Sequence, residues 1–396
     1  MNTWHLPRGY RYAGVVTGLR SEPDRRDVAL VVSDTPAAAA GVFTQNRVCA
    51  APVQVSRARL PRADARAIVV CSGNANACTG EQGLRDAERM AELTARGVGC
   101  RPEQVLVAST GIIGRPLPMP VLEIGIPKAV AAARDGSDAL DDAAHAILTT
   151  DTKIKVATRE LDLASGLVRV AGFAKGAAMI GPNMATMLGF VLTDAAVAPP
   201  FAHDVLRRAA DKTFNCVSVE GHTSTNDTVF LLANGTGSHL SGDDAQRFDR
   251  AVEEVCADLA RQIAADAEGA SHLIRIDVEG CRSDADARTI AKAVAESALV
   301  KTAVFGADPN WGRVVSAAGY AGVPFEERDL SLWMGDLPLY RDGQPLPFDA
   351  AAASGYLRTN REVHFRLRLT LGTGRVTFYT SDLTYEYVKL NADYTT

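Results

Sequence analysis

The stretch GPNMATMLGF, residues 181–190, joins a turn-forming Gly-Pro-Asn start to an apolar end and places Thr186 directly behind the small residue Ala185. The stretch before it, FAKGAAMI (residues 173–180), carries a single charge, that of Lys175. A hydroxyl at this junction has a structural and a chemical explanation. The structural explanation is that Thr186 begins a buried strand, as β-branched residues often do.

The chemical explanation starts from a cut between Ala185 and Thr186, which would leave Thr186 as a chain N-terminus. Its hydroxyl and free amine would then lie on adjacent carbons, and an α-amine with a pKa of roughly 7.7–8.0 can take up the hydroxyl proton near pH 7. The same hydroxyl can make the cut by attacking the preceding carbonyl in an N-to-O acyl shift, for which the small residue and the turn leave room. The local sequence leaves both explanations open.

Composition and charge favour a soluble globular protein with small-molecule or protein partners. The chain has 396 residues, 47% of them hydrophobic and 22% charged, with a formal net charge of −5. This length allows two domains or one large α/β unit. No basic run indicates a nucleic-acid or anionic-membrane partner. The N-terminus shows no signal-peptide pattern, and the apolar runs are shorter than the ~20 residues that cross a bilayer.

The seven cysteines are scattered along the chain, and no two of them form a CxxC pair. Neither a zinc site nor a disulfide framework is therefore predicted. We expect a reduced, cytoplasmic protein that holds no metal.

Apolar runs of strand length are spread among segments of helical periodicity. The predicted strands cover residues 27–34, 67–73, 104–110, 167–173, 187–194, 227–235 and 272–280. The predicted helices cover residues 119–134, 199–214, 243–267 and 284–300, the last with an aspartate as its N-cap. Because the strands cluster rather than alternate strictly with helices, we expect a layered α/β fold with mixed sheets.

The C-terminal tail, from VHFRLRLTLG onward, alternates apolar and polar residues. We expect an antiparallel hairpin there, joined at Gly372–Gly374, with KLNADYTT running directly off its second strand. A boundary near residue 280 would separate a smaller C-terminal region, residues 281–396.

The loop ASTGIIGRPLP, residues 108–118, leaves a strand and is rich in glycine and hydroxyl groups. Hydroxyls and backbone N–H groups of this kind can stabilise the oxyanion of an acyl transfer, with Thr110 and Gly111 as the candidates. A phosphate cradle is the rival function, but both GxGxxG and the P-loop lysine are missing. A plain glycine-rich turn is the structural alternative.

Four further polar positions have functional and structural explanations. Lys175 could hold a substrate carboxylate or tune the threonine amine, or it could reach water from a strand end. Glu268, after the longest predicted helix, could meet a substrate ammonium or lie in solvent. Asn391 and Thr396 could be held in a site, or they could fray as chain ends usually do.

The order of these motifs along the chain resembles the ornithine acetyltransferase family of arginine biosynthesis, also called bifunctional glutamate N-acetyltransferase/amino-acid acetyltransferase. The resemblance covers nearly the whole chain. It rests on SGNANACTG, STGIIG, TTDT, KGAAMIGPNMATML, EGHTSTNDT, AEGAS, GADPNWGR and the terminal NADYTT. The chain departs from the commoner pattern at Ala177, Ala178, Gly181 and His222.

This resemblance implies that the chain cuts itself before Thr186, so that residues 1–185 form an α chain and residues 186–396 a β chain. It makes Thr186 the nucleophile and assigns the oxyanion hole to Thr110 and Gly111. The implied substrate contacts are Thr152, Lys175, Thr186, Glu268, Asn391 and Thr396.

The implied reaction is a ping-pong acyl transfer. Thr186 takes an acetyl group from N2-acetyl-L-ornithine and passes it to L-glutamate, giving ornithine and N-acetylglutamate. No metal or cofactor is needed, and acetyl-CoA is a second donor in the bifunctional members. The implied fold is a layered α/β sandwich of two intertwined regions, assembled as a heterotetramer of two α and two β chains.

Two other functions are compatible with the same residues. An N-terminal-nucleophile amidase or aminopeptidase would use Thr186 but pass the acyl group to water. A non-catalytic binding protein would keep the pocket and leave its chain uncut.

Overall fold

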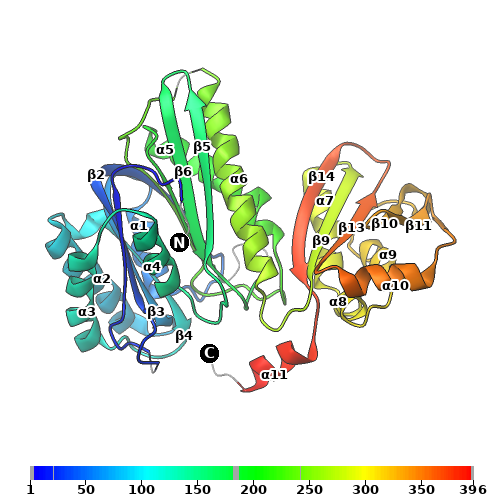
Figure 1. Ribbon diagram of the computed structural model, residues 1–396, viewed down its shortest axis with the longest axis horizontal. Coiled ribbons are helices and arrows are strands. Elements are labelled where there is room, and N and C mark those ends of the chain that lie inside the picture. Colours follow the sequence, from blue (N-terminus) through cyan, green and yellow to red (C-terminus); the bar gives the residue numbers. More distant parts are fainter. Residues whose placement is uncertain (1–3, 21, 182–186, 241, 394–396) are drawn as a thin grey trace.

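The computed structural model describes residues 4–20, 22–181, 187–240 and 242–393. Ala185, Thr186 and Thr396 lie outside the described residues. The described chain forms two bodies, each built on its own β-sheet (Figure 1). The last helix, α11 (Tyr385–Asp393), lies beneath the gap between them.

The larger body is built on an eight-stranded sheet with the order β4-β3-β2-β8-β7-β6-β5, and β1 pairs with β2 beside this path. Its strands are β1 (Tyr10–Val15), β2 (Val28–Phe43), β3 (Arg62–Asn74), β4 (Val105–Ile112), β5 (Lys155–Leu163), β6 (Gly166–Lys175), β7 (Leu188–Thr193) and β8 (Thr228–Ala233). The β3–β4 and β7–β8 pairs are parallel, whereas the other pairs are antiparallel. The expected mixed sheet is therefore confirmed.

Helices pack on both faces of this sheet. They are α1 (Ala51–Arg59), α2 (Gly80–Val98), α3 (Met119–Ala132), α4 (Ser137–Ala146), α5 (Pro199–Lys212) and α6 (Asp244–Ala265), with short 3-10 helices at Pro102–Gln104 and Phe214–Cys216. Helices α1–α3 share a core with alternate residues of β1–β4, and α5 and α6 share one with alternate residues of β2 and β6–β8. The strand residues that alternate with these two sets form a third core with α4. This core includes the stacked rings of Phe173 and Phe190.

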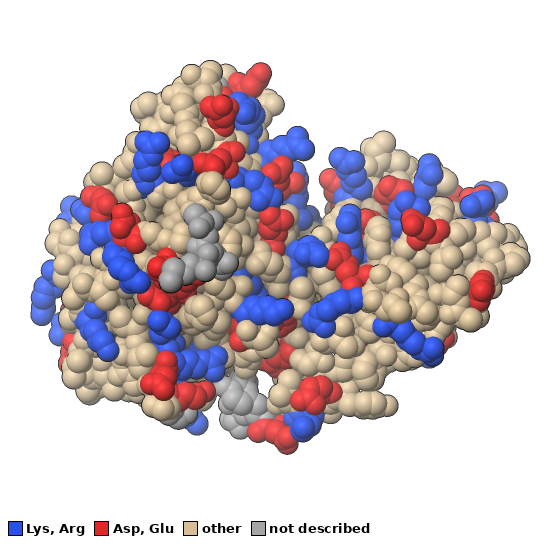
Figure 2. All heavy atoms as spheres, viewed as in Figure 1, with Lys and Arg blue, Asp and Glu red and all other residues tan. Residues whose placement is uncertain are grey.

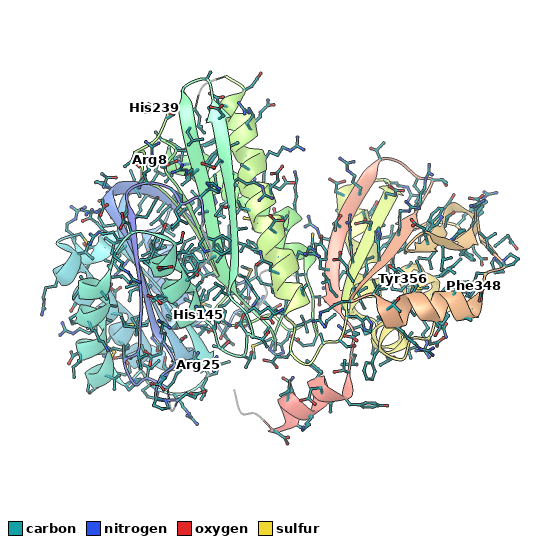
Figure 3. The ribbon with its side chains drawn as sticks, viewed as in Figure 1. Arg8, Arg25, His145, His239, Phe348 and Tyr356 are labelled. Atoms are coloured by element: carbon teal, nitrogen blue, oxygen red, sulfur yellow. The ribbon has the colours of Figure 1, made fainter. Side chains whose placement is uncertain are left out.

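The smaller body is built on a six-stranded sheet with the order β12-β11-β10-β13-β9-β14. Its strands are β9 (Leu273–Cys281), β10 (Ser331–Met334), β11 (Leu337–Arg341), β12 (Gln344–Pro345), β13 (Glu362–Arg368) and β14 (Gly374–Ser381). Its helices are α7 (Asp284–Glu296), α8 (Ala298–Phe305), α9 (Trp311–Gly319), α10 (Ala350–Thr359) and a 3-10 helix at Glu327–Asp329. One core joins these helices to the sheet, with Phe348 and Tyr356 of the α10 region packed against it (Figure 3). Because this sheet includes β9, the smaller region begins before residue 281.

Segments from before and after residue 186 are interleaved in the larger sheet. Strands β7 and β8, which follow residue 186, lie between β2 and β6, which precede it. Backbone ladders join β8 to β2 on one side and β7 to β6 on the other. The expectation of two intertwined regions is therefore confirmed, since neither segment could form this sheet alone.

The expected C-terminal hairpin is wrong. Strands β13 and β14 do not pair with each other, because β9 lies between them, parallel to β13 and antiparallel to β14. The segment after β14 is not a continuing strand but helix α11. The Thr384 hydroxyl accepts a hydrogen bond from the Tyr387 N–H at 3.0 Å and so stabilises the first turn of that helix.

The expected single helix over residues 284–300 is wrong as well. It is divided into α7 and α8 at Ser297, whose backbone is extended and whose hydroxyl caps α8 by accepting the Val300 N–H. The N-cap of α7 is Ser283 rather than an aspartate, since the Ser283 hydroxyl accepts the Asp286 N–H at 3.1 Å. Serine competes for backbone hydrogen bonds and therefore favours helix ends over interiors.

Candidate active site

A pocket of about 600 Å³ brings together residues that lie far apart in the sequence. Five of the predicted site residues line it: Thr110, Gly111, Lys175, Glu268 and Asn391. They come from β4, β6, the loop after α6, and α11. Convergence of polar groups from several elements on one cavity is typical of a ligand site.

Thr110 and Gly111 lie at the end of β4, next to β3. The parallel register pairs Ser72 with Thr110 and Gly73 with Gly111. Gly111 has a φ of +135°, and a Cβ there would lie 2.2 Å from the Gly73 carbonyl carbon, so only glycine fits this close approach of two backbones. The Thr110 hydroxyl has no hydrogen-bond partner within the described part of the chain. A free hydroxyl and a backbone N–H at this strand end are the donors that an oxyanion requires.

Lys175 ends β6 and lines the pocket with only 2% of its surface exposed. The alternative that it reaches bulk water from a strand end is therefore wrong. Burial lowers the pKa of its ammonium, while Asp151 and Asp227 act in the opposite direction. Among the residues that the structure describes, none forms an ion pair or hydrogen bond with this ammonium. Its charge is thus available to a ligand carboxylate.

Glu268 and Asn391 line the pocket and contact each other. The Asn391 amide donates a hydrogen bond to Glu268 Oε2 at 3.2 Å. Helix α11 is held there by the Thr384 hydroxyl, which donates to the Gly269 carbonyl at 2.6 Å. A Cβ on Gly269 would lie 2.5 Å from the Tyr387 nitrogen, so the helix packs directly on this backbone. Helix α11 therefore places Asn391 in the pocket lining beside Glu268.

Thr152 is not among the residues that line the pocket. Its N–H donates to Asp266 Oδ2 at 3.0 Å, and its hydroxyl donates to Asp266 Oδ1. Thr149 and Thr150 of the same TTDT motif do line the pocket, and Arg25, labelled in Figure 3, donates to the Thr149 carbonyl. Direct contact between Thr152 and a substrate stays a prediction.

Other pocket residues were not singled out from the sequence. They include Arg20, Arg115 and the loop Ser224–Asn226. The Asn226 amide donates to the Ala75 carbonyl at 2.6 Å and to the Ser109 carbonyl at 2.8 Å, so it ties that loop to the ends of β3 and β4. Ser224–Asn226 fall within the motif EGHTSTNDT and Arg115 within the loop ASTGIIGRPLP, whereas Arg20 lies outside every motif quoted above. The contacts themselves are tertiary, so the sequence does not show them.

Hydrogen bonds hold the chain in place on both sides of residues 182–186, at Ile180 and at Met187. The Ile180 carbonyl accepts the Val219 N–H at 2.7 Å. On the other side, the Met187 N–H donates to Asp227 Oδ1 at 3.1 Å. Asp227 is fully buried, burial raises its pKa well above the usual range, and its Oδ2 has no partner among the described atoms.

Gly181 is one of the positions at which the chain departs from the commoner family pattern. A Cβ there would lie 2.5 Å from the Gly221 carbonyl carbon and 2.9 Å from the His222 nitrogen. This packing therefore requires glycine. His222, another departure, is exposed and is not part of the pocket lining.

Figure 2 shows acidic and basic side chains interspersed over the visible face. Within the described ranges, no three His, Cys, Asp or Glu side chains are grouped as metal ligands. The helices of those ranges include none with the length and apolar character needed to cross a membrane.

Comparisons with known proteins find similarity along nearly the whole chain. Residues 11–396 match the model of the ArgJ family. The arginine biosynthesis bifunctional protein ArgJ of Symbiobacterium thermophilum is 48% identical over 395 residues, which cover 98% of each chain. The protein of the same name from Thermosynechococcus vestitus is 45% identical over 408 residues, covering 98% of this chain and 97% of that one. A crystal structure of the ArgJ protein from Bacillus halodurans is 37% identical with a TM-score of 0.50, and it matches over 52% of this chain and 98% of its own.

Proposed function

Because the chain belongs to the ArgJ family, we propose that Thr186 is the nucleophile of an acetyl transfer in the pocket lined by Thr110, Gly111, Lys175 and Glu268. The protein is an acyltransferase of arginine biosynthesis. It moves an acetyl group from N2-acetyl-L-ornithine to L-glutamate and so produces ornithine and N-acetylglutamate. The bifunctional names of the relatives support acetyl-CoA as a second donor.

In the first half of the reaction, the Thr186 hydroxyl attacks the acetyl carbonyl of acetylornithine. The α-amine of Thr186 takes up the hydroxyl proton, and the negative charge develops on the former carbonyl oxygen. Thr110 and Gly111 donate to that oxygen, and one such donor is worth about 10²–10³ in rate. The C–N bond then breaks, the proton passes to the departing amine, and ornithine leaves an acetyl ester on Thr186.

In the second half, the amine of glutamate attacks the ester carbonyl and receives the acetyl group. The glutamate nitrogen gives up a proton to the α-amine of Thr186, which passes it to the Thr186 oxygen as the C–O bond breaks. Both substrates carry an α-carboxylate and an α-nitrogen, so one pair of contacts serves both. The buried Lys175 ammonium holds the carboxylate, and Glu268, with Asn391 bound to it, faces the nitrogen.

The nucleophile becomes an N-terminus when the chain cuts itself between Ala185 and Thr186, giving chains of residues 1–185 and 186–396. The half-length match to the Bacillus halodurans structure supports a cut near the middle. Interleaving of β7 and β8 with β2 and β6 would keep the two chains together afterwards. Thr396 completes the substrate contacts.

The protein needs no resident metal or cofactor for this chemistry, since an amine and a hydroxyl supply all the proton transfers. We place it in the cytoplasm as a heterotetramer of two α and two β chains.

The observation that carries this proposal is the convergence of Thr110, Gly111, Lys175, Glu268 and Asn391 on one pocket. The test incubates the purified protein with acetylornithine, with and without glutamate, and measures ornithine, N-acetylglutamate and acetate. We expect ornithine and N-acetylglutamate in equal amounts, and slow ornithine release without glutamate. Rapid release of ornithine and acetate without glutamate would instead identify a hydrolase.

A further inference from the structure

We propose that Lys155, Asp151 and Asp266 form a buried ion cluster that positions the substrate-binding groups of the pocket. This inference rests on the proposed function, because it assigns these three residues a part in binding the shared α-amino-acid frame of the substrates. They are positioning residues, since they act through Lys175 and Glu268. None of the three lines the pocket.

The three side chains of the cluster are close together and buried. Lys155 Nζ lies 2.7 Å from Asp151 Oδ1 and 2.7 Å from Asp266 Oδ2. The Lys155 side chain is 1% exposed, Asp151 0% and Asp266 9%. Lys155 and Lys175 together hold the pKa of the Asp151 carboxyl down to about 2 in spite of burial, so this carboxyl stays charged. A lysine that bridges two buried carboxylates fixes the segments that carry them.

Each carboxylate also binds backbone of a segment that lines the pocket. Asp151 accepts the Gly176 N–H at 2.6 Å, directly after Lys175, and the Thr149 N–H at 3.1 Å. It therefore connects the end of β6 to the TTDT loop. Because Lys175 and Thr149 both line the pocket, a shift of Asp151 would move two parts of its wall.

Asp266 connects the same loop to the segment that carries Glu268. It accepts the N–H groups of Thr152 and Lys153, at 3.0 and 3.3 Å, and the Thr152 hydroxyl. Glu268 follows two residues later, and its own N–H donates to the Ala177 carbonyl at 2.9 Å. The hydrogen bonds of Thr152 to Asp266 thus connect it to the cluster, which gives Thr152 an indirect route to the pocket beside the predicted direct contact.

The test replaces Lys155 with methionine, which keeps the length of the side chain and removes its charge. Asp151 and Asp266 would then lose the cation that bridges them, and the segments that carry Lys175 and Glu268 would separate. We expect the KM values for acetylornithine and for glutamate to rise together by about 10- to 100-fold, because small displacements of binding groups have effects of this size. Lys212, an exposed lysine that pairs with Glu253 at 2.7 Å on the surface helices α5 and α6, provides the matched control, since Lys212→Met should leave both KM values unchanged.

A second variant keeps the test informative if Lys155→Met does not fold. Asp266→Asn preserves shape and removes one charge, and it should raise both KM values in the same way by a smaller factor. Lys155→Arg should recover part of the binding. Wild-type KM values in a folded Lys155→Met or Asp266→Asn protein would overturn the proposal.

The pH profile separates positioning from a general loss of structure. Asp151, Lys155, Asp227 and Arg20 act on the charge of Lys175, Asp151 raising its pKa and Lys155 lowering it. The alkaline limb of kcat/KM should therefore move to lower pH in Asp151→Asn and to higher pH in Lys155→Met. Limbs that stay in place or move in the same direction would contradict the cluster model. If wild-type protein exchanges acetyl groups between acetylornithine and glutamate, such a result affects the cluster alone; if it does not, the proposed function fails first.

Discussion

Substitution of Gly111 by alanine tests the proposed oxyanion site at the point where two backbones lie closest together in it. A Cβ at Gly111 would lie 2.2 Å from the Gly73 carbonyl carbon and 2.5 Å from the Asn74 nitrogen. Both are backbone atoms, so the end of β4 would have to move by about 1 Å to reach an ordinary contact distance. A displacement of that size costs about 10²-fold in rate, or ~2.7 kcal/mol of transition-state stabilisation. The alanine would also carry a φ of +135°, which costs on the order of 1–3 kcal/mol of stability.

The assay measures kcat for acetyl exchange together with the free energy of unfolding. Gly114 supplies the control, because it also has a positive φ of +79° but has open space around its Cβ position. Gly114→Ala should lower the free energy of unfolding by roughly 1 kcal/mol and leave kcat unchanged. We expect Gly111→Ala to lose about 100-fold in kcat. If Gly111→Ala loses stability as Gly114→Ala does but keeps the wild-type kcat, Gly111 has no part in stabilising the oxyanion.

Further predictions follow from the same pocket. Thr110→Val removes a hydroxyl at nearly constant volume, so kcat should fall about 100-fold with little change in the melting temperature; a wild-type kcat would exclude this hydroxyl as a donor. Lys175→Met should raise both KM values and abolish the alkaline limb of kcat/KM. The folded-state pKa of Lys175 is lowered, so the unfolded chain binds its proton more strongly, and the wild-type lysine destabilises the fold at pH 7. Lys175→Met should therefore unfold at a higher denaturant concentration than wild type at pH 7, and a lower midpoint would refute this reasoning. Arg115 lines the pocket and is without an ion-pair partner in the described chain, so Arg115→Ala should raise the KM for glutamate, with its second carboxylate, more than the KM for acetylornithine. Equal changes in the two KM values would exclude that role.

Local sequence was sufficient to predict those helices and strands that have a clear apolar periodicity. The apolar stripe of α6 and the continuous apolar run of β8 lie within a few residues of their predicted bounds. The partners of β13 and β14 could not be predicted in the same way. A strand with alternating residues can pair with any neighbour. Strand β9, which comes before helices α7 to α10 in the chain, takes the place between them. The division of one helical pattern at Ser297 was missed because the apolar periodicity continues across it, although serine itself favours helix ends.

The candidate site was predictable only where a motif marked it. Thr110, Gly111, Lys175, Glu268 and Asn391 were found from motifs, and the structure brings them to one pocket. The Lys155 cluster carries no motif outside TTDT, and its lysine looks like an ordinary strand residue in the sequence. Only the fold reveals that Asp151 and Asp266, from distant segments, share its ammonium.

The central claim, that Thr186 becomes the catalyst by cutting the chain, is tested most directly by the intact mass of purified protein under denaturing conditions. The account predicts two polypeptides, residues 1–185 and 186–396, which elute together in native buffer because their strands share one sheet. Thr186→Ala should give one uncut chain without acetyl exchange. A wild-type protein that exchanges acetyl groups at full rate as a single uncut chain would contradict the account.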